Sequence, residues 1–192
     1  MAPPDRSDGR LGTVAPAAVV LLLFALLVVV AGAWPPFVAV ESGSMEPHLE
    51  RGDLVLLTAT DRFAPPHATD AGVVTSATAS TYRRLGAPGD VIVFAPPSRD
   101  GSPVIHRAAF RVERGENWYD EADPDALPAS VNGCDDLAHC PAPHAGYVTK
   151  GDANGAYDQA GRFTVVRDAR LRGKAQVAIP WVGHLRLLLA GA

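Results

Sequence analysis

Two serines on either side of a glycine, Ser42 and Ser44, are residues that could carry out chemistry. In an extended segment, residues two apart point their side chains to the same face. Gly43 would let a second chain approach the backbone closely, and Pro47 would stiffen the end of the segment. One hydroxyl could attack a carbonyl carbon while the other, with a backbone N–H, faces the developing oxyanion. A plain Ser/Gly turn would also explain these residue types, so the hypothesis depends on residues further along the chain.

A histidine and two acidic residues follow these serines, each beside a turn or a strand edge. His106 lies within an apolar segment, 104–112, that reads as a strand, and Asp152 and Asp158 follow a later short apolar segment. A single histidine within a strand usually has a structural role. A serine, a histidine and an acid together are the groups of a catalytic triad, in which the acid orients the histidine that takes the serine proton. The three residue types therefore predict nucleophilic catalysis by a serine.

A lysine could also activate a serine, and the chain has two, Lys150 and Lys174. Lysine has an ordinary pKa of about 10.4, so its neutral form near pH 7 costs about 4.6 kcal/mol of desolvation or like-charge repulsion. Histidine has an ordinary pKa of about 6.5 and needs only an acid that fixes its tautomer. The histidine at position 106 and the acids downstream form a coherent set, and a Ser-Lys mechanism fits poorly.

The elements that must position these residues read as short strands. The 17 prolines and 18 glycines favour strands and loops over long helices. Apolar runs that follow turn residues predict strands at 54–57, 91–94, 104–112, 146–149, 163–166 and 175–179. The result is a mainly antiparallel β domain.

The connections between these strands differ in character. We expect the strands at 91–94 and 104–112 to form a hairpin through the Pro/Gly-rich segment 95–103. Residues 59–88 show no clear period and are expected to be loop, and 113–145 form an acidic, Pro-rich insertion. No internal repeat is visible, so we predict a single β domain over 35–186.

A long apolar run precedes this domain. Residues 14–33 carry no charge, and as a helix they would be about 30 Å long, the thickness of one bilayer core. Trp34 stands where an interfacial aromatic residue would lie. A cleaved signal peptide is the competing interpretation, because Ala31-Gly32-Ala33 resembles a cleavage site. The run is longer than a signal core and its leading tail is barely basic, so we predict a retained transmembrane helix over 14–34.

Charge and composition set the orientation and exclude some partners. Arg6 and Arg10 in the tail 1–13 place the N-terminus in the cytoplasm and the β domain outside the cell membrane. The net charge is −4 with no basic block, so nucleic acid is not expected as a partner. At the other end, the apolar tail 187–192 is too short to span a bilayer and would lie at its surface at most.

The cysteines and the remaining histidines have simpler interpretations. Cys134 and Cys140 lie in the insertion close to two histidines, but their spacing matches no usual zinc pattern. A local disulfide outside the cell is favoured instead. His48, His67 and His184 are assigned no function and are expected to be surface or core residues.

Three ordered segments resemble the type I signal peptidases, in their archaeal and endoplasmic-reticulum branch. The resemblance extends from the apolar helix to about Gly183. Bacterial members carry lysine at the place equivalent to His106, so the histidine here indicates the other branch. At position 153 this chain has alanine where the family's acid box usually has asparagine. The boxes for the nucleophile, the base and the acid are, respectively, Ser42-Gly43-Ser44-Met45-x-Pro47, Gly89–Val93 with Val104–Arg107, and Thr149–Asp152 with Asp158.

The resemblance implies a signal-peptidase-like antiparallel β domain that is anchored by one N-terminal transmembrane helix. It also implies a serine endopeptidase that removes signal peptides from exported preproteins, with no metal or other cofactor. Ser44 would attack the scissile carbonyl, and His106 would take its proton and later protonate the leaving amine. Asp158 would orient His106, and Asp152 would give support. Ser42 and the Ser44 N–H would form the oxyanion hole.

The same resemblance describes how a substrate would bind. The signal segment would pair as an extended strand with a strand edge near Ser44, and shallow pockets would select small residues one and three positions before the cut. The expected partners are therefore exported preproteins and the lipid bilayer, and the question of accessory subunits stays open.

Two alternatives carry a different function. The chain could be a membrane-anchored, non-catalytic β domain that binds an extracellular partner and keeps the boxes as structural turns. It could also be a self-cleaving serine protease of the LexA-like kind, which would have a lysine base and usually a DNA-binding domain.

Overall fold

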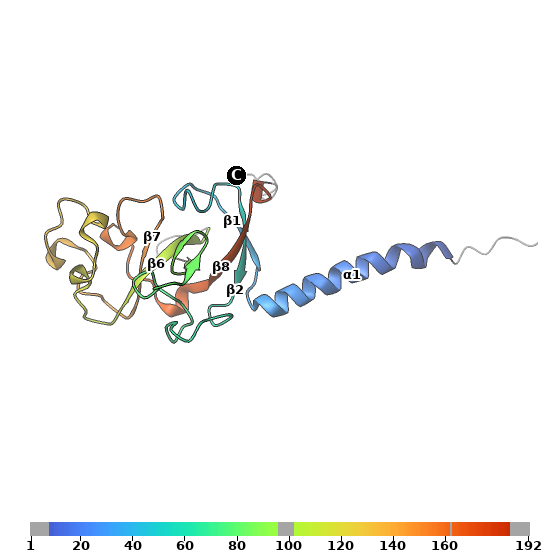
Figure 1. Cartoon of the computed structure of the whole chain (residues 1–192), viewed down its shortest axis with the longest axis horizontal. Helices are drawn as coiled ribbons and strands as arrows, with labels where there is room; N and C mark the ends of the chain where they lie inside the picture. The colour runs from blue at the N-terminus through green and yellow to red at the C-terminus, as the bar shows by residue number, and fades with distance from the viewer. Residues whose placement is uncertain (1–7, 96–101, 162, 185–192) are drawn as a thin grey trace, which may run out of the picture.

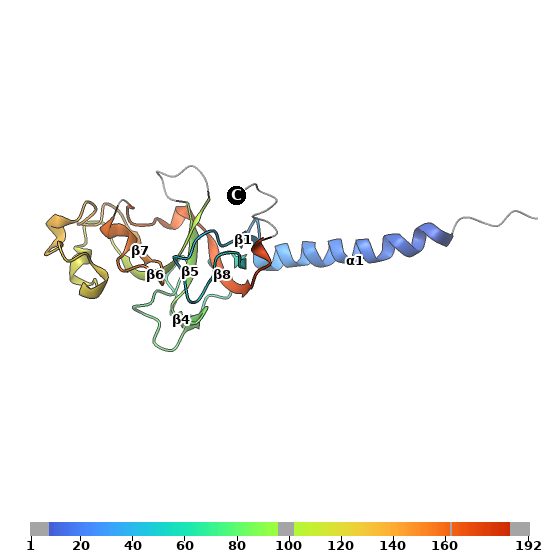
Figure 2. The same ribbon diagram turned by 90° about the horizontal axis from the view of Figure 1, so that it is seen from above.

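The structure is a computed structural model that describes residues 8–95, 102–161 and 163–184 (Figure 1). A β domain forms its main body, and one helix, α1 (Asp8–Ala31), projects away from that body in both ribbon views (Figures 1 and 2). Apolar side chains of α1 are exposed; Leu21 and Leu22 are each 69% exposed. The helix ends at Ala31, whose carbonyl accepts a hydrogen bond from the Ala59 N–H at 2.8 Å.

Most of the predicted span 14–34 therefore lies in α1. Within the part of the chain that the structure describes, no helix combines the length and apolar character needed to cross a membrane. The predicted tails fall largely or wholly outside the described residues: 1–7 of the N-terminal tail and all of 187–192.

The β domain is built on one six-stranded antiparallel sheet, so the prediction of a mainly antiparallel β fold is confirmed. The strand order in space is β1-β2-β8-β5-β6-β7. The hairpin expected from 91–94 and 104–112 forms as β5 and β6, and it pairs Ile92 with His106. The bounds are β1 Phe37–Ala39, β2 Leu54–Thr58, β5 Val91–Phe94, β6 Val104–Val112, β7 Gly146–Lys150 and β8 Leu171–Ile179.

Two predictions from the sequence need correction, one of a strand and one of a loop. The apolar run 163–166 forms no named strand; Val166 only makes a single bridge to Tyr147. Val165 and Val166 are buried in hydrophobic clusters, so packing rather than strand pairing explains why the run is apolar. Residues 59–88, expected to be loop, include a small second sheet of β3 (Arg83–Arg84) and β4 (Ala87–Pro88).

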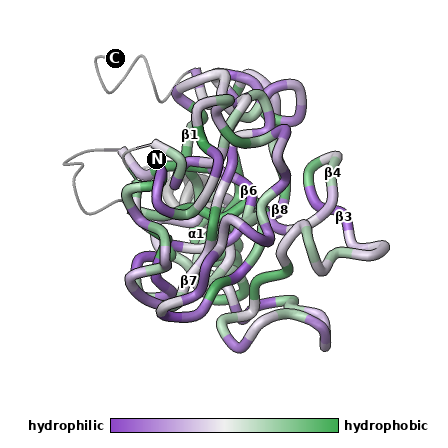
Figure 3. Tube along the Cα trace, turned by 90° about the vertical axis from the view of Figure 1, so that its left-hand side faces the viewer, coloured by the Kyte–Doolittle hydropathy of each residue, from purple (hydrophilic) through white to green (hydrophobic). Residues whose placement is uncertain are grey.

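The hydrophobic core has separate parts beneath the sheet and beneath the insertion. In Figure 3 the tube is green along parts of the central strands and purple along much of the outer loops. Within the insertion 113–145, Trp118 is fully buried and its indole N–H donates to the His139 carbonyl at 2.9 Å. Cys134 and Cys140 form the disulfide that the sequence favours. The insertion thus packs its apolar side chains against β6 and β7 in one cluster and carries its own cross-link.

Candidate active site

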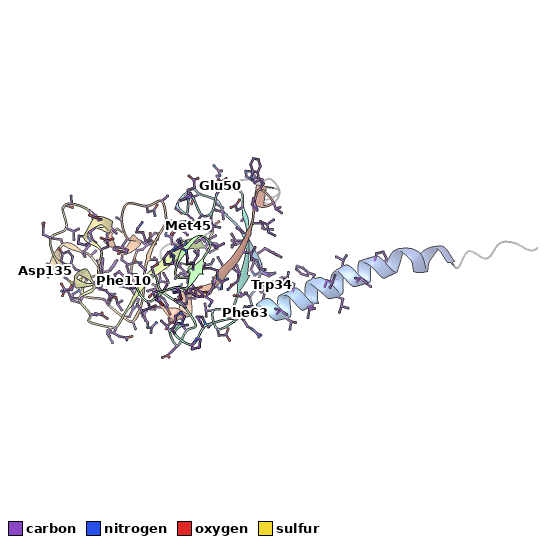
Figure 4. The ribbon with its side chains drawn as sticks, in the orientation of Figure 1. Trp34, Met45, Glu50, Phe63, Phe110 and Asp135 are labelled. Carbon is purple, nitrogen blue, oxygen red and sulfur yellow. A yellow bond between two sulfur atoms is a disulfide. The ribbon has the colours of Figure 1, made fainter. Side chains whose placement is uncertain are left out.

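The turn between β1 and β2 holds Ser44 in a fixed place. Met45 and Leu49, on the same turn, are 1% and 0% exposed and pack into the main core. Figure 4 labels Met45 in the interior of the β domain. The Leu49 N–H also donates to the Met45 carbonyl at 3.0 Å. Because its neighbour is anchored in this way, Ser44 stays half-buried at the surface of the core.

His106 reaches Ser44 from β6, which β8 and β5 separate from β1 and β2 in the sheet. Its Nε2 lies 3.0 Å from the Ser44 Oγ. The histidine occupies the third position of β6, in the middle of its pairing with β5, and its exposed fraction is only 7%. A central strand position limits the freedom of the ring, so this distance is held by the sheet.

Asp158 lies on the other side of the imidazole. Its Oδ2 is 2.6 Å from the His106 Nδ1, and the Thr149 hydroxyl donates to the same oxygen at 2.7 Å. An ionised carboxylate can only accept, so Nδ1 carries the proton here and Nε2 is left as the acceptor for the Ser44 hydroxyl. This tautomer is the one that a general base needs.

The loop after β7 packs directly on the Ser44 turn. The Ala153 N–H donates to the Ser44 carbonyl at 2.9 Å. A Cβ placed on Gly151 would lie 2.6 Å from that same carbonyl oxygen, closer than real Cβ atoms come to backbone. The loop that carries Asp158 can therefore reach the serine only with glycine at position 151.

Ser42 lies beside Ser44 and both hydroxyls face one cavity. The two Oγ atoms are 3.3 Å apart, although the segment that carries them is a bend and turn rather than the extended segment expected from the sequence. The cavity has a volume of about 380 Å³ and is bounded by β1 with the residues after it and by the start of β6. It is here called the serine cavity, and its lining residues are Val38–Ser42, Ser44, Met45, Ser102–His106 and Phe163.

Asp152 has different partners from Asp158. The Arg107 guanidinium donates to both of its carboxylate oxygens, at 2.8 and 2.6 Å. The His48 Nδ1 lies 2.8 Å from the Asp152 Oδ2. The structure thus brings Ser42, Ser44, His106 and Asp158 together and places Asp152 in a separate network.

His48, to which the sequence assigned no function, contacts Asp152. It lies four residues after Ser44, on the same turn, and its side chain is 29% exposed. Its partner comes 104 residues later in the chain. No local pattern marks such a contact, and only its closeness to the nucleophile box could have suggested it.

The two lysines have partners of their own. The Lys174 ammonium is fully buried, donates to the Gly72 carbonyl at 2.6 Å and lies 3.4 Å from the Asp90 carboxylate. Desolvation lowers the pKa of Lys174, while the nearby Asp90 opposes that effect. Lys150 donates to the carbonyl oxygens of Gly151 and Asn154.

Among the described residues, no group of three or more His, Cys, Asp or Glu is arranged to hold a metal ion.

Comparisons with known proteins agree with this geometry. The family described as signal peptidase, peptidase S26, matches residues 11–109, just over half of the chain and including Ser44 and His106. The signal peptidase complex catalytic subunits SEC11C of Homo sapiens, Mus musculus and Canis lupus familiaris are each 26% identical over 174 residues, or 88% of this chain. The chain spans 65% of the length of these relatives. It therefore belongs to the signal peptidase family S26, in the endoplasmic-reticulum and archaeal branch of the type I enzymes.

Proposed function

We propose that this protein is a membrane-bound serine endopeptidase that removes N-terminal signal peptides from exported preproteins. Ser44 is the nucleophile, His106 the general base and Asp158 the residue that orients it. The observation that carries the proposal is the continuous row of hydrogen bonds from the Ser44 Oγ through His106 to the Asp158 carboxylate, at 3.0 and 2.6 Å.

This row supports the usual two steps of serine proteolysis. His106 takes the hydroxyl proton as Ser44 attacks the scissile carbonyl, and then gives it to the leaving amine, so an acyl-enzyme forms. In the second step His106 takes a proton from water, which attacks the acyl-enzyme and releases the signal peptide from Ser44. The buried Asp158, which is hydrogen-bonded to Nδ1, stabilises the imidazolium in both steps.

Ser42 is well placed to stabilise the oxyanion. Its hydroxyl lies 3.3 Å from the Ser44 Oγ, next to the point where a substrate carbonyl would be attacked. With the Ser44 N–H it would supply two donors, and loss of one such donor typically slows a reaction by about 10²–10³-fold.

The serine cavity supports an extended substrate with small side chains. One wall is β1, which lies at the edge of the sheet, so a peptide could add there as a further strand. Val38, Ile105 and Met45 make much of the remaining lining apolar and leave room for small residues before the cut.

We propose that the apolar run 14–34, most of which lies in α1, anchors the enzyme in the lipid bilayer, with the N-terminus in the cytoplasm and the β domain outside. The supporting observation is that α1 projects from the domain with its apolar side chains uncovered, among them Leu21 and Leu22 (Figure 1). Trp34, 74% exposed, lies at the base of this helix, where a membrane interface would be (Figure 4).

The test is cleavage of a preprotein by the full chain in detergent micelles. Ser44→Ala should lose all processing while its thermal midpoint stays near that of the wild type. Ser130→Ala is the matched control, because this exposed serine lies in the insertion. If Ser44→Ala keeps more than a few per cent of the wild-type rate, serine catalysis is excluded.

A further inference from the structure

Three hollows of the β domain follow one another and share residues. The first, here called the foot cavity, has a volume of about 260 Å³ and is lined by Trp34 and Pro35, just after α1. Val38 and Pro103 line both the foot cavity and the serine cavity. Phe163 in turn lines both the serine cavity and a third hollow of about 1230 Å³. The three, linked through these shared residues, are here called the row of hollows, and Ser44 lines the serine cavity, which shares residues with both of the others.

The third hollow, here called the insertion groove, lies between the insertion and the acid-bearing loop. One wall is the segment 153–158 with the residues just after it, which includes Asp158 itself. The other wall is made by Pro128, Ala138 and His139 of the insertion. Most of the lining side chains are small, so the walls leave space for the side chains of a bound peptide. Its lining residues are Pro128, Ala138, His139, Ala153–Asp158, Ala160, Gly161 and Phe163.

The row has a direction. The foot cavity touches the residues that follow α1, and the insertion lies at the end of the molecule opposite to α1, where Figure 4 labels Asp135 (Figures 1 and 4). Under the proposed function, a signal segment leaves the bilayer on the side of α1. It would therefore reach Ser44 through the foot and serine cavities, and the chain beyond the cut would continue toward the insertion.

We propose that the insertion groove binds the residues that follow the cut in the preprotein, as an extended chain. This inference rests on the proposed function and assigns a role to the insertion 113–145. Two features carry it. The groove shares Phe163 with the serine cavity, and Asp158, the proposed orienting acid of His106, forms part of the groove wall. A peptide held across Ser44 has to leave the serine cavity on this side.

The groove then contributes binding energy in proportion to the length of chain after the cut. An extended chain advances about 3.3 Å per residue, so about ten residues reach well beyond Ser44. Two synthetic peptides test this, with the same signal-side sequence and alanines one and three positions before the cut. One continues for about ten residues after the cut and the other for about two, and both end in an amide. The wild-type enzyme in micelles should cleave the long peptide with a kcat/KM about tenfold higher.

A variant that narrows the groove gives the second arm of the test. Ala138→Trp places a large side chain on the insertion wall, outside the Ser44–His106–Asp158 row. It should lower kcat/KM for the long peptide by about tenfold and leave the short peptide unchanged. Ala129→Trp is the matched control, because Ala129 is an exposed residue of the insertion that does not line the groove. This control should cleave both peptides like the wild type.

Each outcome decides between the two proposals. Equal wild-type kcat/KM for the two peptides would overturn the inference and assign the groove to another occupant, such as a partner subunit. An Ala138→Trp enzyme whose kcat/KM falls equally for both peptides, or falls for neither, would also overturn it, because the groove wall would then not act on the residues after the cut. Failure of the wild type to cleave either peptide or the parent preprotein would instead remove the proposed function.

Discussion

Asp152 and Asp158 lie six residues apart on one loop, but their carboxylates have different partners. Asp158 accepts from His106 at 2.6 Å, whereas Asp152 is held by Arg107 at 2.6 and 2.8 Å. Both partners are neighbours in the chain, on β6, and their side chains extend to opposite faces because adjacent residues of a strand alternate. One loop therefore meets both faces of β6, with one acid directed to the proposed base and the other to an arginine.

Asp158→Asn and Asp152→Asn should differ in the property that they change. Asp158→Asn should fold normally and lower kcat by about 10⁴-fold, because an amide can favour the wrong imidazole tautomer. Asp152→Asn removes the carboxylate from the buried Arg107 and should lower the free energy of unfolding by about 1.5–3 kcal/mol, with a smaller effect on kcat. Preprotein cleavage and urea unfolding of both variants check this. An active Asp158→Asn enzyme beside a folded but inactive Asp152→Asn enzyme would reverse the two roles.

The positions of most strands could be predicted because their signals are local. Apolar runs after Gly-Asp turns place β2 and β5 to within one residue. The order of the sheet could not be predicted in this way. β8 lies between β2 and β5, and its pairing joins Leu54 to Ile179, residues far apart in the chain. Such pairings depend on which faces are buried together, and the local patterns of a single sequence do not show this.

The candidate site likewise has one part that could be predicted from the sequence and one part that could not. Ser44, His106 and a downstream acid could be proposed because serine catalysis needs these residue types, and the resemblance to signal peptidases favoured Asp158 as the acid. The link from His48 to Asp152 could not, since a histidine in a turn has no local pattern and its partner is 104 residues away. The prediction of a strand at 163–166 was wrong, because buried segments and paired strands contain the same apolar residue types.

The contact between the acid-bearing loop and the Ser44 turn should be sensitive to a single methyl group. In Gly151→Ala the new Cβ would meet the Ser44 carbonyl oxygen at 2.6 Å, so the backbone has to move and the nearby Ala153–Ser44 hydrogen bond weakens. A displacement of about 1 Å can cost about 100-fold in rate, and a fall of that order in kcat/KM is expected. Gly133→Ala is the control, because nothing lies within 4 Å of its new Cβ and Gly133 lines neither the serine cavity nor the insertion groove. Equal activity of the two variants would contradict the close contact.

Burial of Lys174 should make the free energy of unfolding depend on pH in the alkaline range. Its pKa is lowered in the folded protein, chiefly by desolvation, so the unfolded chain binds more protons between that lowered value and about 10.4. The free energy of unfolding should therefore rise with pH through this window, because the penalty for burying the charge disappears as Lys174 loses its proton. Urea unfolding of the wild type and Lys174→Met across this range gives the measurement. The variant should lack the rise, and parallel pH profiles would contradict the assignment.

His48 should act as a positioning residue through Asp152. The Asp152 carboxylate joins three segments: its own loop, which carries Asp158; β6 through Arg107, next to His106; and the Ser44 turn through His48. His48 is the only one of these partners on the turn that carries Ser44, so it ties the nucleophile to the base and the acid. Loss of this tie should let Ser44 move relative to His106 without changing the serine cavity.

His48→Ala should therefore lower kcat by about tenfold and leave KM nearly unchanged, because His48 does not line the serine cavity. The atom that bonds Asp152 is Nδ1, and the amide nitrogen of asparagine occupies nearly the same place whereas that of glutamine lies further out. His48→Asn should thus restore most of kcat, and His48→Gln should restore less. Steady-state cleavage of one preprotein peptide by the three variants, with their thermal midpoints, separates this role from general stability. Equal kcat in the Asn and Gln variants, or a wild-type kcat in His48→Ala, would show that the link to Asp152 does not position Ser44.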